Sequence, residues 1–180
     1  EGELLQIEKT KKLNLTEEDY FQIINYKTAS LFQCSFKVGA IAAEANKKTI
    51  DYLGELGLTI GSIFQIKDDI LDYNTSKKSG KQSGNDIAEG KINLPLLYAL
   101  KKMNFVEKNR VYRLLRKKTN SREEIKFVQN KVLKYKGLED AVAVMQKNYK
   151  QAINILDAFP SNNYQKAIKL LLSFLMERKK

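Results

Sequence analysis

The chain has 180 residues, of which 43% are apolar and 29% charged, which is typical of a globular domain with a buried core and excludes a disordered chain. It contains one cysteine and no histidine, which excludes an internal disulfide, histidine-based catalysis and histidine-ligated metals. The net charge of +11 comes from residues 101–180, which contain 20 Lys and Arg against 7 Asp and Glu. This region lacks a nucleic-acid recognition motif, so we interpret it as a solvated basic surface. Nucleic-acid binding is kept as the weaker alternative.

The first part of the chain is predicted to be helical, because prolines are rare and no β-type alternation is present. The opening EGELLQIEKTKK resembles the end of a helix already under way, so we expect the natural N-terminus to precede Glu1. Thr16 followed by Asp19 predicts the start of a helix. Cys34 is interpreted as a core residue. The helix that begins at Thr16 is expected to have an apolar face that packs against the core, made of Tyr20, Ile23, Ile24 and Leu31. A polar pair, Lys27 and Thr28, lies beside this face.

Further helices are expected through KVGAIAAEA and from about Lys48 to Tyr73. Residues 74–93 are rich in Gly, Ser, Asn and Lys and are predicted to form a long loop, which is usually functional or disordered. A new helix should begin between Asn93 and Pro95. Residues 105–180 predict three or four amphipathic helices, one of them with a capping box at Ser121. The fold class is therefore all-α, with seven to nine helices in one domain.

Three carboxylates occupy the end of the long helix. Asp68 and Asp72 share one face with Gln65, and Asp69 lies beside them. Anions at this end oppose the helix macrodipole, so the acids are either a solvated face or a cation site. The glycine-rich loop with Lys81 and Lys91, together with the separate pair Lys27 and Thr28, favours the second interpretation. Carboxylates for Mg²⁺ and lysines for phosphate are the groups that a metal-diphosphate site needs.

These motifs resemble a known family. The stretches GSIFQIKDDILDY and GKQSGNDIAEGKINLPLLYAL are similar to the second aspartate-rich region of the trans-(E)-isoprenyl diphosphate synthases, and KTASLFQCSFKVGAI is similar to their KT motif. The match covers residues 1–100 with the family's spacing. The sequence EGKINLPL resembles that of the long-chain, octaprenyl-type branch of the family, although Asn93 stands where threonine is commoner in that branch.

The resemblance implies a role for each matching residue. Asp68 and Asp72 would coordinate Mg²⁺, with Asp69 and Asp86 supporting them from a second layer. The residues that would contact the diphosphate are Lys27, Lys81 and Lys91, which are the catalytic candidates, with Thr28 and Gln65 as hydrogen-bond donors. The loop around 77–84 would be mobile without ligand and would close when metal and diphosphate bind.

The resemblance also implies the fold, the reaction and the partners. Residues 1–180 would be a single all-helical fragment, the C-terminal part of an isoprenoid-synthase helical bundle whose first half, with the other DDxxD motif, is absent. The reaction would be the Mg²⁺-dependent, head-to-tail condensation of isopentenyl diphosphate with an allylic diphosphate. A cytoplasmic homodimer is expected, with no transmembrane segment and with peripheral membrane contact for long products. The fragment alone would be inactive. The alternative is a non-catalytic small subunit or helical interaction protein of the same fold.

Overall fold

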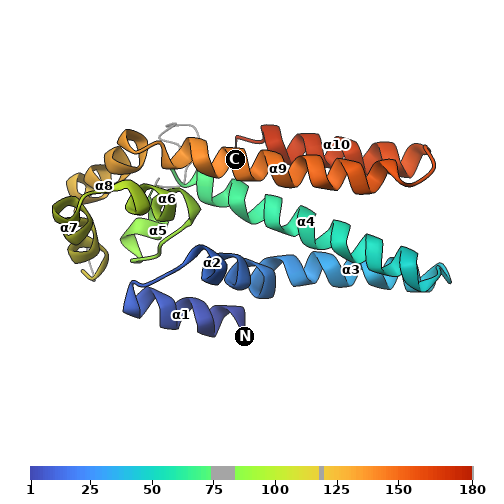
Figure 1. The fold of residues 1–180 in the computed structure, drawn as a ribbon, viewed down its shortest axis with the longest axis horizontal. Coiled ribbons are helices and arrows are strands. Elements are labelled where there is room, and N and C mark those ends of the chain that lie inside the picture. Colours follow the sequence, from blue (N-terminus) through green and yellow to red (C-terminus); the bar gives the residue numbers. More distant parts are fainter. Residues whose placement is uncertain (74–83, 118–119, 180) are drawn as a thin grey trace. The chain divides into compact units, whose positions relative to one another are not determined.

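The structure is a computed structural model that describes residues 1–73, 84–117 and 120–179. These residues form helices and no strand (Figure 1), which confirms the predicted all-α class. The elements are α1 (Gly2–Lys12), α2 (Glu17–Ile24), the π-helical turn η1 (Asn25–Ala29), α3 (Ser30–Ala42), α4 (Lys47–Leu71), α5 (Asn85–Ala88), α6 (Leu94–Lys102), α7 (Phe105–Leu115), α8 (Arg122–Lys134), α9 (Gly137–Asp157) and α10 (Asn163–Glu177). Among the described residues, no helix has both the length and the apolar character that crossing a membrane requires.

The chain divides into two compact units. Unit 1 contains residues 1–3, 21–67 and 144–179, and unit 2 contains residues 4–20 and 68–143. Helix α4 contributes to both, since its residues up to Lys67 belong to unit 1 and those from Asp68 belong to unit 2. Each unit has its own buried apolar side chains, such as Ile60 in unit 1 and Leu96 in unit 2.

In unit 1, α4 runs alongside η1 and α3, and glycines make this close approach feasible (Figure 1). A Cβ on Gly61 would lie 2.5 Å from the Cα of Ala29, and a Cβ on Gly57 would lie 2.7 Å from the carbonyl oxygen of Phe32. The Phe32 and Phe64 rings then pack with their centroids 5.8 Å apart. Larger residues at these two glycines would therefore separate the helices.

Helix α10 completes unit 1 and lies beside the end of α9 (Figure 1). The side-chain nitrogen of Gln165 donates to the backbone oxygens of Leu156 at 2.7 Å and Phe159 at 3.1 Å. At the other end of α10, Lys67 donates to the backbone oxygen of Met176 at 2.6 Å. These bonds at both ends determine which side of α10 faces the core.

In unit 2, short polar residues begin the helices as the sequence predicts. Thr16 and Asp19 bond reciprocally at the start of α2, with distances of 3.0 and 3.1 Å. Asn93 is the N-cap of α6, and Ser121 forms a full capping box with Glu124 at the start of α8. These predicted helix starts are confirmed, as are the four helices of residues 105–180.

Three expectations about the chain were wrong. Leu31 is 71% exposed and Cys34 is also exposed, because only one side of α3 packs against α4. Helical periodicity predicts an apolar face but does not say whether a neighbour covers it. The third concerns the predicted loop 74–93, within which residues 85–88 form helix α5. With that short helix, the described residues form ten α-helices where seven to nine were expected.

Candidate active site

Asp69 is the most buried of the three acids at the end of α4, with 5% of its surface exposed. Its Oδ2 accepts a hydrogen bond from the Tyr20 hydroxyl at 2.7 Å and from the backbone N–H of Leu94 at 3.1 Å. The first bond joins the end of α4 to α2, and the second joins it to the first residue of α6. Burial and the adjacent Asp69 carboxylate together raise the pKa of Tyr20 well above its ordinary value. Asp69 therefore holds the backbone that carries its two acidic neighbours.

Asp72 accepts hydrogen bonds from residues 84–86, which lie within the predicted loop and include the start of α5. Its two carboxylate oxygens accept from the backbone N–H groups of Asn85 at 3.1 Å and Asp86 at 3.2 Å, and its backbone oxygen accepts from Gly84 at 2.9 Å. Gly84 has φ +88°, a left-handed conformation that suits glycine. Burial, and secondly the nearby Asp86 carboxylate, raise the pKa of Asp72 despite these bonds. The ionised form of Asp72 is thus less stable here than it is in water.

Asn93 is a site residue whose contacts the sequence did not reveal. Its Nδ2 donates to Asp86 at 3.0 Å, and its Oδ1 accepts from the Tyr73 hydroxyl at 2.7 Å and from the backbone N–H of Leu96 at 3.3 Å. Tyr73 is buried, and so is the Asn93 side chain. A buried tyrosine requires a hydroxyl partner, which is the only signal in the sequence that pointed to this network.

The remaining candidates of unit 2 are Asp68, Lys81 and Lys91. Asp68 is partly exposed on α4. Lys91 forms an ion pair with Glu89 that leaves its side chain 30% exposed. Lys81 and the predicted closure of the loop fall on residues 74–83 and lie outside the described residues. The structure therefore joins Asp72 and Asp86 to Asn93 through hydrogen bonds, and Asp69 bonds separately to Tyr20 and to the backbone of Leu94. The roles assigned to the two lysines stay predictions.

The KT pair lies in unit 1, on the π-helical turn η1. The Thr28 hydroxyl donates to the side-chain oxygen of Gln65 on α4 at 2.9 Å. Lys27 forms an ion pair with Glu3 at 2.8 Å. The chain can approach so closely there because residue 2 is glycine: a Cβ on Gly2 would lie 2.6 Å from the backbone nitrogen of Lys27. The sequence predicted a plain helix here; π-helical turns often occur at functional sites, since they widen the helix locally.

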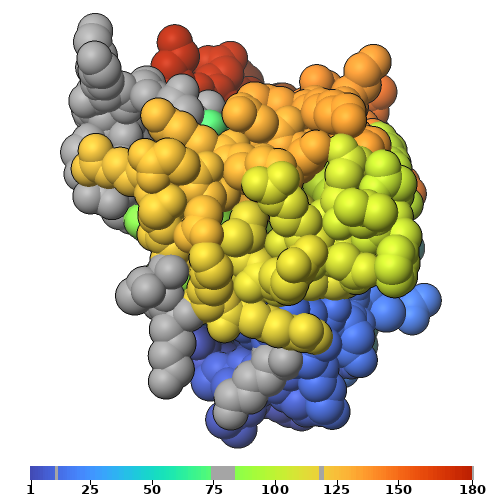
Figure 2. Space-filling model, turned by 90° about the vertical axis from the view of Figure 1, so that its left-hand side faces the viewer, coloured from blue at the N-terminus to red at the C-terminus, as the bar shows by residue number. Residues whose placement is uncertain are grey.

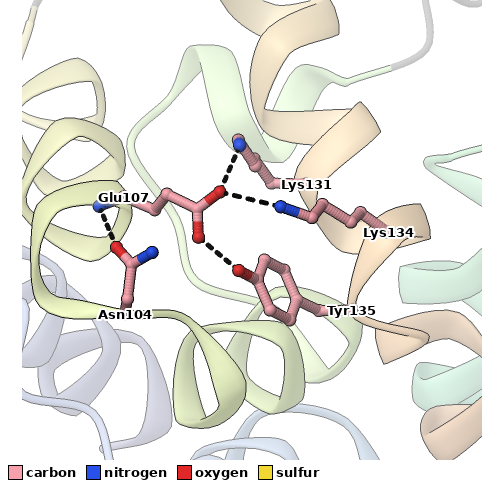
Figure 3. Close-up of polar contacts among 5 residues, drawn as sticks. All are labelled: Asn104, Glu107, Lys131, Lys134 and Tyr135. Carbon is pink, nitrogen blue, oxygen red and sulfur yellow. Dashed lines mark hydrogen bonds and ion pairs between the residues drawn. The ribbon is translucent and has the colours of Figure 1, made fainter.

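A second polar cluster lies between α7 and α8, whose residues lie next to each other on the face drawn in Figure 2. Glu107 accepts from Lys131, from Lys134 at 3.1 Å and from the Tyr135 hydroxyl, while Asn104 accepts from the Glu107 backbone N–H at 2.9 Å (Figure 3). The bond from Lys131 is the main reason that the pKa of Glu107 falls to about 2. The charges of this cluster satisfy one another, so we interpret it as a structural link between the two helices.

A surface cavity of about 400 Å³ also lies between α7 and α8. Its lining consists of Arg110, Arg113, Leu114, Lys117, Glu123, Glu124 and Phe127. None of the predicted site residues contributes to it, so the cavity is not a candidate for the metal-diphosphate site.

The donor set at the end of α4 fits a magnesium ion in its chemistry. All its side-chain donors are carboxylate oxygens, and the chain has no histidine to offer. Within residues 1–73, 84–117 and 120–179, no three Asp, Glu or Cys side chains converge to hold a metal by themselves. Mg²⁺ does not require such a cage, because it usually takes one or two carboxylates and completes its shell with water and substrate phosphate. A nearby cation would stabilise the ionised form of Asp72 and would therefore lower the raised pKa of this acid.

Solved structures with the same fold are synthases of isoprenyl diphosphates. A geranylgeranyl pyrophosphate synthase from Bacteroides thetaiotaomicron matches with a TM-score of 0.91 and 34% identity, over 98% of this chain and 59% of that one. A heptaprenyl diphosphate synthase from Staphylococcus aureus matches with a TM-score of 0.90 and 32% identity, over 99% and 56% of the two chains. The all-α fold is thus the isoprenoid-synthase fold that the motifs implied.

The polyprenyl synthetase family model matches residues 1–132, and this chain belongs to that family. A geranylgeranyl diphosphate synthase from Sulfolobus acidocaldarius is 33% identical over all of this chain and 55% of its own length. An octaprenyl diphosphate synthase from Haemophilus influenzae is 30% identical over 99% of this chain and 54% of its own. The chain thus spans about half the length of these curated relatives and corresponds to their C-terminal portion.

Proposed function

We propose that this chain contributes one part of the active site of a polyprenyl diphosphate synthase. The reaction would be the Mg²⁺-dependent, head-to-tail condensation of isopentenyl diphosphate with an allylic diphosphate. Membership of the polyprenyl synthetase family supports this proposal, as do the names of relatives that act on prenyl chains of several lengths. The chain contains one DDxxD motif, at residues 68–72, so we further propose that it does not catalyse the reaction alone.

The observation that carries the proposal is that partly buried carboxylates lie close together at the end of α4. Asp72 is partly buried and lies near the Asp86 carboxylate; burial, and secondly that carboxylate, raise the pKa of Asp72. A solvated acidic face would not show this rise, because water would stabilise the charge. Perturbed acids of this kind are common where a cation or substrate binds.

Each residue then has a proposed task. Asp68 and Asp72 would hold the Mg²⁺, which when bound offsets the negative charge of the departing diphosphate. Asp69 and Asp86 would keep these two acids in place through the bonds to Tyr20 and Asn93.

The cationic and polar candidates would bind the diphosphate itself, and they are Lys27, Lys81, Lys91, Thr28 and Gln65. Lys27 and Lys91 form ion pairs with Glu3 and Glu89 in the structure, so a diphosphate would compete with these carboxylates for the ammonium groups. As the bond between the allylic carbon and the diphosphate oxygen breaks, these groups would stabilise the charge that develops on that oxygen. The electron pair of the isopentenyl double bond would then form the new bond to the allylic carbon, and the added unit would lose a proton so that a double bond forms again.

We also propose that the protein works as a homodimer. Leu31, Cys34, Val38 and Ile41 are all exposed on α3, and their spacing of three, four and three residues is that of a helix-packing seam. A second copy could cover this seam. The sole thiol, Cys34, suits a reducing compartment such as the cytoplasm. Light scattering of the chain and of its Leu31→Lys variant is the test, and a monomeric mass for both would contradict the homodimer.

The metal-diphosphate site is tested without activity by thermal unfolding with Mg²⁺ and inorganic diphosphate. The pair should raise the melting temperature of the chain, because a ligand that binds only the folded state stabilises it. Asp68→Ala and Asp72→Ala should remove that rise, whereas the control Asp51→Ala, an exposed acid on the same helix, should keep it. An equal rise in all three variants would place the binding site elsewhere.

Activity is tested on the longest natural form of the protein, with isopentenyl and allylic diphosphates. We expect product with Mg²⁺ and none in excess chelator, and a loss of several orders of magnitude for Asp68→Ala, on the order of 10³-fold, because metal-assisted stabilisation of a leaving group supplies several kcal/mol. Full activity in chelator would refute the proposal. Absence of both activity and diphosphate binding would favour the non-catalytic subunit.

A further inference from the structure

The cavity of about 400 Å³ between α7 and α8 carries its positive and negative charges on opposite sides. Its α7 side has Arg110, Arg113 and Lys117, whose spacing of three and four residues places them on one face of the helix. Its α8 side has two acids, Glu123 and Glu124. The volume lies at the lower end of the range that small-molecule sites occupy. The partners of these charged groups therefore indicate which class of molecule the cavity suits.

Both acids of the cavity already have partners at the start of α8. Glu124 forms an ion pair with Lys117, and its carboxylate also accepts from the backbone N–H of Ser121 at 3.0 Å. Hydrogen bonds from its own backbone N–H, and secondly from Ser121, lower the pKa of Glu123. The first turn of a helix stabilises negative charge, so the two carboxylates are held there.

The two arginines of the cavity differ from the acids in this respect. In the part of the chain that the structure describes, no acid forms an ion pair with Arg110 or Arg113. Arg110 is nevertheless held in place, because its guanidinium lies over the Phe127 ring, 4.0 Å from the ring centroid. A side chain that is already ordered loses less conformational freedom when it binds an anion. The cavity thus has more positive charge than its own acids balance, and part of that charge is pre-positioned.

We propose that the cavity between α7 and α8 binds a small organic phosphate. The guanidinium groups of Arg110 and Arg113 together match the charge of a phosphate ester, which is about −1.5 to −2 at pH 7. A guanidinium can also donate two parallel N–H bonds to phosphate oxygens, which a lysine cannot do. Two identical charges suit a doubly charged phosphate better than a singly charged carboxylate.

The apolar part of the lining selects the group to which the phosphate is attached. Leu114 is only 9% exposed, and Phe127 is partly buried. Inorganic phosphate would leave these side chains in contact with water, whereas an aromatic or aliphatic group beside the phosphate would cover them. None of the residues assigned to the metal-diphosphate site lines the cavity, so this binding needs neither Mg²⁺ nor the proposed reaction.

The test is isothermal titration calorimetry of the chain with phenyl phosphate, without metal. We expect saturable binding, and inorganic phosphate and phenol should each bind at least about tenfold more weakly, because each lacks one of the two parts that the cavity contacts. Chemical shifts in NMR spectra should change at the residues that line the cavity. No saturable binding of phenyl phosphate would overturn the proposal, and so would equal affinity for phenyl phosphate and inorganic phosphate.

A pair of matched variants distinguishes the cavity from the general positive charge of the chain. Arg113→Gln should weaken the binding of phenyl phosphate by at least about tenfold, because a charged donor is lost. The control Arg116→Gln removes the same charge from an exposed residue beside α7 that does not line the cavity, and it should bind as the unchanged chain does. Equal weakening by both variants at unchanged helicity would overturn the proposal. Arg113→Gln should keep the rise in melting temperature with Mg²⁺ and inorganic diphosphate, so a failure here is distinguishable from a failure of the proposed function.

Discussion

The close approach of α4 to η1 can be tested by adding one methyl group. Gly61→Ala would place a Cβ 2.5 Å from the Cα and 2.8 Å from the Cβ of Ala29. No side-chain rotation relieves a clash with backbone, so η1 must move by about 1 Å to reach ordinary contact distance. Because η1 carries Thr28, the bond from Thr28 to Gln65 would be strained by the same movement.

The magnitude follows from two opposing effects. Alanine is about 1 kcal/mol better than glycine inside a helix, while overpacking of this kind costs about 1–3 kcal/mol, and a backbone clash belongs at the upper end. Gly61→Ala should therefore destabilise the protein by about 1–2 kcal/mol. The matched control is Gly39→Ala on α3, where a Cβ would meet nothing within 4 Å. That variant gains the helix propensity without a clash and should be stabilised by about 0.5–1 kcal/mol.

The assay is unfolding of the chain by urea and by heat, followed by circular dichroism. The two variants should differ by about 1.5–3 kcal/mol, which corresponds to roughly 3–12 °C in melting temperature for a chain of this size. If Gly61→Ala were as stable as Gly39→Ala, glycine would not be required for the approach of α4 to η1. This result would refute the idea that the small size of Gly61 allows η1 to pack closely against α4.

Other contacts give further predictions. Tyr20→Phe removes the hydroxyl that donates to buried Asp69 and should cost about 1.5–3 kcal/mol of unfolding free energy, measured in urea. Asn93→Ala removes three side-chain hydrogen bonds, one of which caps α6, and should cost about 2–4 kcal/mol in the same assay. The simpler cap variant Asn104→Ala should cost about 1 kcal/mol, and equal costs for the two variants would contradict a linking role for Asn93. The pKa of Glu107 is lowered to about 2, so its contribution to stability is present above pH 4.5 and is lost as the pH falls from there towards 2. Glu107→Gln should therefore make the free energy of unfolding depend less on pH between 4.5 and 2. An unchanged pH dependence in that range would contradict this prediction.

The sequence by itself determined the class of fold and the family. Helix starts depend on residues that are close along the chain, and both Thr16 and Ser121 were predicted to begin helices for that reason. The acidic end of α4 was visible too, since residues three and four apart on a helix share a face. The composition of the donor set, with carboxylates and no histidine, restricts any metal that binds there to a hard ion.

The tertiary structure alone decided which partners these residues have. Asp69 bonds to Tyr20, 49 residues away, and the Thr28 hydroxyl bonds to Gln65, 37 residues away, so neither pair follows from local spacing. The sequence also could not decide whether Cys34 and Leu31 are buried. Both lie on an apolar helix face, but their exposure depends on whether another element covers that face. Local preference determines which helix forms, whereas long-range packing determines what each side of it contacts.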